Sequence, residues 1–340
     1  MPRRKVLRGQ VQSEKLSGDT IELGPEPVRK LAAQPWTVAI CADASRQIGS
    51  GHLMRCLSLA RALRQIGAEV RFYYAAWPGH ADTWLNAQGF HGELLDFAVD
   101  NFLADEDAKD SANVWSTLWQ QQYGHACVKA WQPWLQSLNT QATSSVHRTI
   151  DWCIYDNYGL AADFVKVIKP SCRQLMAIDD LANREHPVDL LLDQNAVFGM
   201  QTRYQTWLPA ACTQLLGPQY ALLRPEFYPS SVPSSVPITS QTSSARSYQQ
   251  VNRILVSIGG SDIVGLTERL CKLLFAQQVF ADISLDVVVG SAYEKITELT
   301  ELIAARANSR LFVQTNEMAS LMRQADLAIG AGGSSQWERA

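Results

Sequence analysis

Short apolar runs alternate with helix-like stretches from residue 37 onward, and most of these runs are apolar on both faces. The first series of runs lies at 37–43, 69–76, 151–156, 174–180 and 188–194. A strand that is apolar on both faces needs helices on both sides, and this arrangement is typical of parallel sheets. The sequence therefore predicts an α/β fold built on a parallel sheet.

A second series of apolar runs follows at 252–260, 284–290, 310–315 and 326–333. Between the two series, the chain is rich in serine and proline, as linkers and exposed loops are. A chain of 340 residues is also long for a single core. We therefore predict two Rossmann-like domains at 36–228 and 251–340, a linker at 229–250 and a disordered polar extension at 1–35.

The composition narrows the class of partner. A net charge of −3 gives no reason to expect nucleic acid or an anionic membrane. No apolar run approaches the ~18 residues of a membrane span, and the basic N-terminus lacks the apolar segment of a secretory signal. The seven cysteines are scattered without a C-x-x-C pair, which favours a reducing compartment and no zinc module. We expect a cytoplasmic monomer that binds a small molecule and uses no cofactor.

The segment 97–150 combines an acidic patch with tryptophans at 115, 119, 131 and 134. Their near-helical spacing predicts a pair of helices packed on the first domain. We interpret these tryptophans as core or interface residues in preference to a ligand-binding box.

The joint after the run 37–42 carries the first candidate site. Asp43, Ser45, Gly49 and Gly51 lead into a helix-like stretch, so His52 should stand in its first turn. Backbone N–H groups at a helix start attract anions, and glycines let a ligand approach the main chain. We therefore predict that this joint contacts a ligand.

Besides a ligand-binding site, this joint could be a mere tight turn, a dinucleotide fingerprint, or a metal or thiol–imidazole site. A dinucleotide fingerprint starting at Gly49 would place its last small residue at Met54, whose bulk opposes close helix–strand contact. His52 and Cys56 share a helix face and would suit a metal pair or a thiol–imidazole couple. We interpret Cys56 as a buried small side chain, because it adjoins the inward stripe of the helix. His52 is the candidate general base, since a neutral imidazole can accept a proton.

Two glycine turns mark the second domain. They read VSIGGSD (256–262) and IGAGGSS (329–335), and each follows a predicted strand. Glycine turns at the carboxyl ends of parallel strands suit a phosphate-bearing ligand. Glu338 follows in the helix that the second turn opens. Its carboxylate can accept hydrogen bonds from ribose hydroxyls, or it can simply stabilise the start of the helix.

Together, seven blocks resemble the UDP-2,4-diacetamido-2,4,6-trideoxy-β-L-altropyranose hydrolases of pseudaminic acid biosynthesis. The blocks are DASRQIGSGHLMRCLSLA (43–60), YDNYG (155–159), AIDD (177–180), DLLLDQNA (189–196), LLGPQYALLRPEF (215–227), VSIGGSD (256–262) and AGGSSQWER (331–339). The resemblance runs, with insertions, from about residue 37 to residue 340. It implies a glycosyltransferase-B-type fold in which two Rossmann-like domains face a cleft.

The resemblance also implies roles for individual residues. It makes His52 the base that activates water. It places the sugar side at Asp156, Tyr158 and Asn195, to which the joint after 37–42 adds Asp43, Ser45, Gly49 and Gly51. It places the UDP side at Gly260, Ser261, Ser334 and Glu338, to which the glycine turns add Gly259 and Gly333. No metal site is implied, and no D-x-D motif stands near the glycine turns.

The implied reaction suits a single base. UDP leaves as a stabilised anion, so the leaving oxygen needs no carboxylic acid to protonate it, in contrast to ordinary glycoside hydrolysis. Water activated by the base would attack C1 opposite UDP and invert that centre. Two alternatives stay open: a glycosyltransferase of the same fold, which passes the sugar to an acceptor hydroxyl, and a non-catalytic protein that binds a nucleotide-sugar.

The chain departs from the family in three places. It carries the leading extension, long insertions near 100–147 and 229–250, and an end at Ala340 inside the last predicted helix. Family members continue there with further strands and helices. We therefore expect a truncated second domain with an incomplete uridine pocket.

Overall fold

The computed structural model describes residues 35–45, 49–77, 82–96, 117–139, 149–228, 251–259, 262, 264–290 and 293–339. Structural statements concern these residues. The predicted linker at 229–250 and all but the last residue of the predicted extension at 1–35 lie outside them.

Seven parallel strands form the first sheet, in the order β3-β2-β1-β4-β5-β6-β7. They are β1 (Thr37–Ala42), β2 (Glu69–Tyr74), β3 (His91–Leu94), β4 (Ile150–Asp156), β5 (Cys172–Ile178), β6 (Leu190–Asp193) and β7 (Thr213–Leu216). The chain builds one half of the sheet from β1 to β3 and then returns beside β1 to build the other half. The order in which the chain adds strands therefore reverses between β1 and β4. This switch point lies where Ala42 pairs with Asp156.

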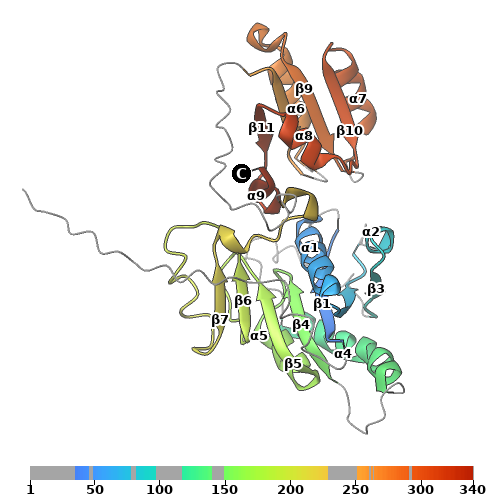
Figure 1. The fold of residues 1–340 in the computed structure, drawn as a ribbon, viewed down its shortest axis with the longest axis vertical. Helices are drawn as coiled ribbons and strands as arrows, with labels where there is room; N and C mark the ends of the chain where they lie inside the picture. Colours follow the sequence, from blue (N-terminus) through green and yellow to red (C-terminus); the bar gives the residue numbers. More distant parts are fainter. Residues whose placement is uncertain are drawn as a thin grey trace, which may run out of the picture. The chain divides into compact units, whose positions relative to one another are not determined.

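Four parallel strands form the second sheet, in the order β10-β9-β8-β11. They are β8 (Arg253–Ser257), β9 (Ser284–Val289), β10 (Ser309–Val313) and β11 (Leu327–Gly330). The same switch recurs here between β8 and β11, where Ser257 pairs with Gly330. Both sheets confirm the predicted α/β fold with two Rossmann-like parallel sheets. The first sheet runs from blue to yellow in Figure 1, and the second from brown to red.

Helices connect most of these strands. They are α1 (Gly51–Gln65), α2 (Asp82–Ala87), α4 (Thr117–Asn139), α5 (Ala162–Ile168), α6 (Leu266–Phe275), α7 (Ile296–Ala304), α8 (Met318–Gln324) and α9 (Ser334–Arg339). Short 3₁₀ turns lie at Lys169–Ser171, Pro218–Tyr220, Pro225–Phe227 and Gln278–Phe280. Within the described part of the chain, no helix combines the length and apolarity that a bilayer crossing requires.

The first sheet is covered on both faces, as its apolar strands require. On β1, Val38 and Ile40 pack into the cluster that contains α1, whereas Ala39 and Cys41 pack into the cluster that contains α4 and α5. All four side chains are 0% exposed. The two clusters hold β1 firmly, and this fixes the position of the loop that follows it.

The tryptophans of the α4 segment belong to this core. Trp119, Trp131 and Trp134 are each at most 1% exposed, which confirms them as core residues. The ring of Trp131 meets that of Tyr73 edge to face, with 6.0 Å between centroids. Trp115 and the other parts of 97–150 at 97–116 and 140–148 lie outside the described residues, so the expected second helix stays a prediction.

Two strands were missed by the sequence analysis. The strands β3 and β7 are four residues long, and both lie at edges of the first sheet. Their sequences, HGEL and TQLL, contain no long apolar run because an edge strand is covered less completely than a central one.

We predict that Trp131→Ala lowers the free energy of unfolding by about 3–5 kcal/mol, since a large buried ring leaves a cavity. Urea unfolding of the purified protein measures this loss. Trp36→Ala is the matched control, because Trp36 is 42% exposed. It should change stability by less than about 1 kcal/mol. Similar small losses in both variants would show that the α4 tryptophans do not support the core.

Candidate active site

The candidate site lies at the carboxyl edge of the first sheet, at the switch point between the parallel strands β1 and β4. This is the place where ligands bind in doubly wound sheets. The loop after β1 turns back at Gly49, whose N–H donates to the carbonyl of Ser45 at 2.8 Å. Gly49 has a φ of +80°, a conformation that a side chain would strain. Helix α1 then begins at Gly51, so His52 stands in its first turn, as predicted.

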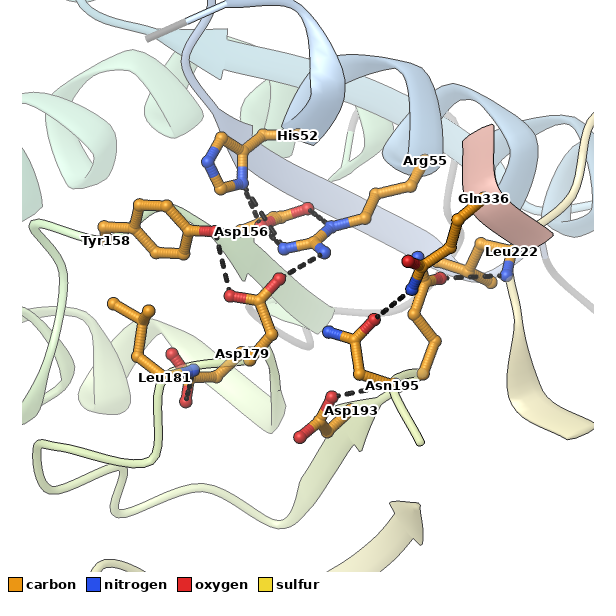
Figure 2. Close-up of polar contacts among 12 residues, drawn as sticks. His52, Arg55, Asp156, Tyr158, Asp179, Leu181, Asp193, Asn195, Leu222 and Gln336 are labelled. Atoms are coloured by element: carbon orange, nitrogen blue, oxygen red, sulfur yellow. Dashed lines mark hydrogen bonds and ion pairs between the residues drawn. The ribbon is translucent and has the colours of Figure 1, made fainter. Parts of the chain in front are cut away.

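His52 is paired with Asp156 from the end of β4. Its Nδ1 lies 2.6 Å from Oδ1 of Asp156 (Figure 2). Burial by itself raises the pKa of Asp156, but the charge of Arg55 and the contact with His52 outweigh it and lower the pKa to about 2. An ionised carboxylate only accepts hydrogen bonds, so Nδ1 must carry the proton. Nε2 has no hydrogen-bond partner among the described residues.

Arg55 holds the same carboxylate from the next turn of α1. Its Nε and Nη2 donate to Oδ2 and Oδ1 of Asp156 at 2.5 and 2.7 Å. Its Nη1 donates to Oδ2 of Asp180, after β5, at 3.0 Å. The Arg55 side chain is 5% exposed and that of Asp156 is 0% exposed. The sequence analysis missed Arg55 and Asp180, although both lie in blocks that carry the resemblance.

Tyr158 closes the cluster on the other side of His52. Its hydroxyl donates to Oδ1 of Asp180 at 2.8 Å. Its ring meets the imidazole edge to face, with 4.5 Å between centroids. Burial, followed by the charge of Asp180, raises the pKa of Tyr158, so the phenol stays neutral and acts as a donor. Figure 2 shows His52, Arg55 and Tyr158 converging around Asp156.

Cys56 packs beneath this cluster. It is 0% exposed, and its Sγ lies 3.7 Å from Oδ2 of Asp156. Burial, followed by the charge of Asp156, raises the pKa of the thiol well above its usual range. A buried thiol that stays protonated is a poor nucleophile and metal ligand. The interpretation of Cys56 as a buried small side chain is confirmed.

Asp43 lies below the surface of the site. It is 2% exposed, and its carboxylate accepts hydrogen bonds from four groups of the protein. The donors are the N–H of Ala75, Nε1 of Trp77, the hydroxyl of Tyr123 and Nδ2 of Asn157, at 2.8, 3.0, 3.1 and 2.7 Å. Asp43 therefore ties β1 to β2, α4 and the loop after β4. A direct contact with a sugar would require one of these bonds to open, so that role stays a prediction.

Asn195 follows β6 and contacts helix α9. Its amide oxygen accepts from Nε2 of Gln336 at 3.2 Å and from Nε1 of Trp337 at 3.4 Å. Its N–H donates to Oδ1 of Asp193 at 3.0 Å. Asn195 is thus connected to the helix that follows the second glycine turn. Its contact with a sugar stays a prediction.

The predicted UDP side lies at the switch point of the second sheet. The turns after β8 and β11 follow neighbouring strands, and Gly259 and Gly333 have φ angles of +139° and +95°. Gly260 and Ser261 lie outside the described residues, and of Ser334 only its place at the start of α9 is described. Asp262 accepts from the N–H groups of Leu266 and Thr267 at 3.0 and 2.6 Å. The start of α6 is therefore capped by the protein itself.

Glu338 forms an ion pair that the sequence did not reveal. Its two carboxylate oxygens accept from Nε and Nη2 of Arg224, each at 2.7 Å. Arg224 belongs to the block LLGPQYALLRPEF, and its partner lies 114 residues away. Two lone pairs of the carboxylate are still available for ribose hydroxyls, so the ribose role of Glu338 stays a prediction. Within the described ranges, no three His, Cys, Asp or Glu side chains form a metal-binding group.

The comparisons with known proteins give distant relatives. No protein-family model matches the chain. It is 24% identical over 308 residues to an uncharacterised protein of Methanocaldococcus jannaschii, which covers 88% of this chain. It is 25% identical over 177 residues to the UDP-2,4-diacetamido-2,4,6-trideoxy-beta-L-altropyranose hydrolase of Campylobacter jejuni, and 27% identical over 194 residues to the spore coat polysaccharide biosynthesis protein SpsG of Bacillus subtilis. These two matches cover 52% and 56% of this chain.

The chain spans about half the length of these curated relatives, between 53% and 57%. Among solved structures, it is similar to Phytolacca americana UGT2 complexed with UDP-2fluoro-glucose and pterostilbene, at a TM-score of 0.49 and 13% identity. It is also similar to the glycosyltransferase SnogD from Streptomyces nogalater, at a TM-score of 0.45 and 15% identity. Each match covers 90% of this chain and 78% of the other. These likenesses are too distant to assign a function.

We predict that Asp156 makes the stability of the protein sensitive to acid. Its pKa is about 2 in the folded chain and about 3.9 when unfolded, so the unfolded state binds the proton more tightly. The stabilisation, about 2 kcal/mol, is present above about pH 4 and is lost as the pH falls toward about 2. Urea unfolding at a series of pH values should show a shallower acid slope for Asp156→Asn. Equal slopes in the two proteins would contradict the ion pair.

Proposed function

We propose that this chain hydrolyses a UDP-linked sugar at C1 and releases UDP and the free sugar with inversion. The observation that carries the proposal is the His52–Asp156 pair at the switch point of the first sheet, with Nδ1 engaged at 2.6 Å and Nε2 free among the described residues. An imidazole oriented in this way has one nitrogen ready to accept a proton. A carboxylate behind it stabilises the imidazolium that forms.

The chemistry follows from these two groups. Nε2 of His52 takes a proton from water while the water oxygen attacks C1. The bond between C1 and the diphosphate oxygen breaks, and its electron pair leaves with UDP. Because that anion is already stable, a second catalytic carboxylate is not required, in contrast to ordinary glycosidases. The negative charge of Asp156 next to Nδ1 makes the protonated imidazole less costly during the attack.

The UDP side of the proposal rests on the second sheet. Its two glycine turns follow neighbouring strands at a switch point, where main-chain N–H groups can approach a diphosphate. Glu338 is proposed to accept hydrogen bonds from the ribose while Arg224 holds its carboxylate in place. Gly259 and Gly333 supply the conformations that such turns need.

The choice of sugar rests on the relatives and on the motif blocks. One relative is named for hydrolysis of a UDP-linked 2,4-diacetamido-2,4,6-trideoxy sugar, and another for spore coat polysaccharide biosynthesis. We therefore propose the same class of UDP-linked diacetamido-trideoxy sugar as substrate, within pseudaminic acid biosynthesis. The residues that carry the chemistry, His52 and Asp156, lie in the blocks DASRQIGSGHLMRCLSLA and YDNYG.

We predict that His52→Asn lowers kcat for release of UDP by about 100-fold or more, because the water loses its base. The affinity for UDP, measured by calorimetric titration, should stay within about threefold, since His52 lies on the sugar side. His125→Asn is the control, because His125 is an exposed histidine of α4 and should leave both values unchanged.

Three results would contradict the proposal in different ways. Unchanged turnover in His52→Asn would remove His52 from the mechanism. UDP release that begins only when a sugar acceptor is added would identify a transferase. Binding of the UDP-sugar without any release of UDP would identify a binding protein.

A further inference from the structure

Arg55 is a buried cation that the proposed chemistry does not use directly. Its side chain is 5% exposed, and it divides its donors between two carboxylates, one at the end of β4 and one in the loop after β5. It uses Nε and Nη2 on Asp156 and Nη1 on Asp180. Its Nη2 also lies 3.4 Å from Nδ1 of His52, too far to compete with the carboxylate at 2.6 Å. Arg55 therefore contacts Asp156, the hydrogen-bond partner of the candidate base.

We propose that Arg55 is a positioning residue for His52, which acts through Asp156 and keeps Nε2 of the imidazole free of a proton. Two properties of the guanidinium produce this effect. Its fork grips both oxygens of Asp156, so the carboxylate cannot rotate away from Nδ1. Its charge keeps that carboxylate ionised although it is fully buried.

Asp156 and Asp180 carry two negative charges and Arg55 one positive charge, which leaves a net charge of −1 beside a neutral imidazole. Without Arg55, the buried carboxylate of Asp156 would lose the cation that contacts it directly, and the His52–Asp156 pair would bind an extra proton. Whether that proton resides on the imidazole or on the carboxyl, Nε2 ends up protonated. The base would then be blocked at neutral pH.

The groups that face the pair come from three elements. Helix α1 contributes Arg55 and Cys56, the end of β4 contributes Asp156 and Tyr158, and the end of β5 contributes Asp180. Cys56 and Tyr158 stay neutral, because burial raises the pKa of both. Arg203 lies nearby, where its Nη2 donates to the carbonyl of Asp180 at 2.9 Å and its Nη1 donates to Asp193. Arg55 is the cation that contacts the carboxylates of both Asp156 and Asp180.

The test compares two replacements of Arg55. Arg55→Gln removes the charge, so kcat at about pH 7 should fall about tenfold or more and should recover as the pH rises by one to two units. Arg55→Lys keeps the charge but loses the fork, so kcat should fall about three- to tenfold at every pH with no displacement of the profile. KM should stay within about threefold in both, since Arg55 acts through Asp156 and not on the substrate.

A second readout does not depend on the substrate. Nitrogen-15 NMR of labelled histidines at about pH 7.5 reports which imidazole nitrogen carries the proton. The signal of His52, assigned by its loss in His52→Asn, should show Nδ1–H and a bare Nε2 in the wild type. In Arg55→Gln, Nε2 should be protonated. Arg310→Gln is the control: Arg310 pairs with the buried Asp286 of the second sheet and should change neither readout.

The kinetic test of this inference rests on the proposed function, whereas the NMR test does not. The two can therefore fail separately. If the wild type releases no UDP but Nε2 gains a proton in Arg55→Gln, the positioning role stands and the proposed reaction fails. If Nε2 stays bare in Arg55→Gln, or if the pH profile does not move, the inference is wrong. Should Arg55→Gln fail to fold, an unchanged kcat in Arg55→Lys would overturn it in the same way.

Discussion

The carboxylate of Asp156 is buried without any exposure, and the architecture of the site depends on how its charge is compensated. Burying an unpaired carboxylate costs several kcal/mol, so the fold must bring cationic and polar donors to it. Two of them, His52 and Arg55, stand three residues apart on α1 and therefore share one face of that helix. The pairing of Ala42 with Asp156 brings the ends of β1 and β4 together, and α1 follows β1 directly. The ion pair thus fixes how α1 sits on the sheet and which nitrogen of His52 is available.

The two sheets use the same topological device for different purposes. Each has a switch point between its first strand and the strand that returns beside it, β1 with β4 and β8 with β11. In the first sheet this edge carries a buried acid–base cluster, whereas in the second it carries two glycine turns. We propose that the base at the first edge activates water and that the glycine turns at the second edge bind the diphosphate. The proposed reaction therefore needs a contribution from both edges.

The sequence predicted the strands that are apolar on both faces and the place of His52, because these follow from local patterns. It missed β3 and β7, whose edge positions need no apolar run. It also missed the partners of the site residues. Arg55 meets carboxylates 101 and 125 residues away, and an arginine on a helix ordinarily indicates a solvated face. Asp43 was predicted at the right end of its strand, but its four donors come from distant segments, so its burial could not be seen from the pattern.

We propose that water, deprotonated by His52, attacks C1 of the sugar. The most direct test is turnover of the UDP-sugar in oxygen-18 water, with mass spectrometry of both products immediately after the reaction. The account predicts that the label enters the released sugar and that UDP stays unlabelled, because the bond that breaks joins C1 to the diphosphate oxygen. Label in the terminal phosphate of UDP would show that water attacks phosphorus, and this result would contradict the mechanism.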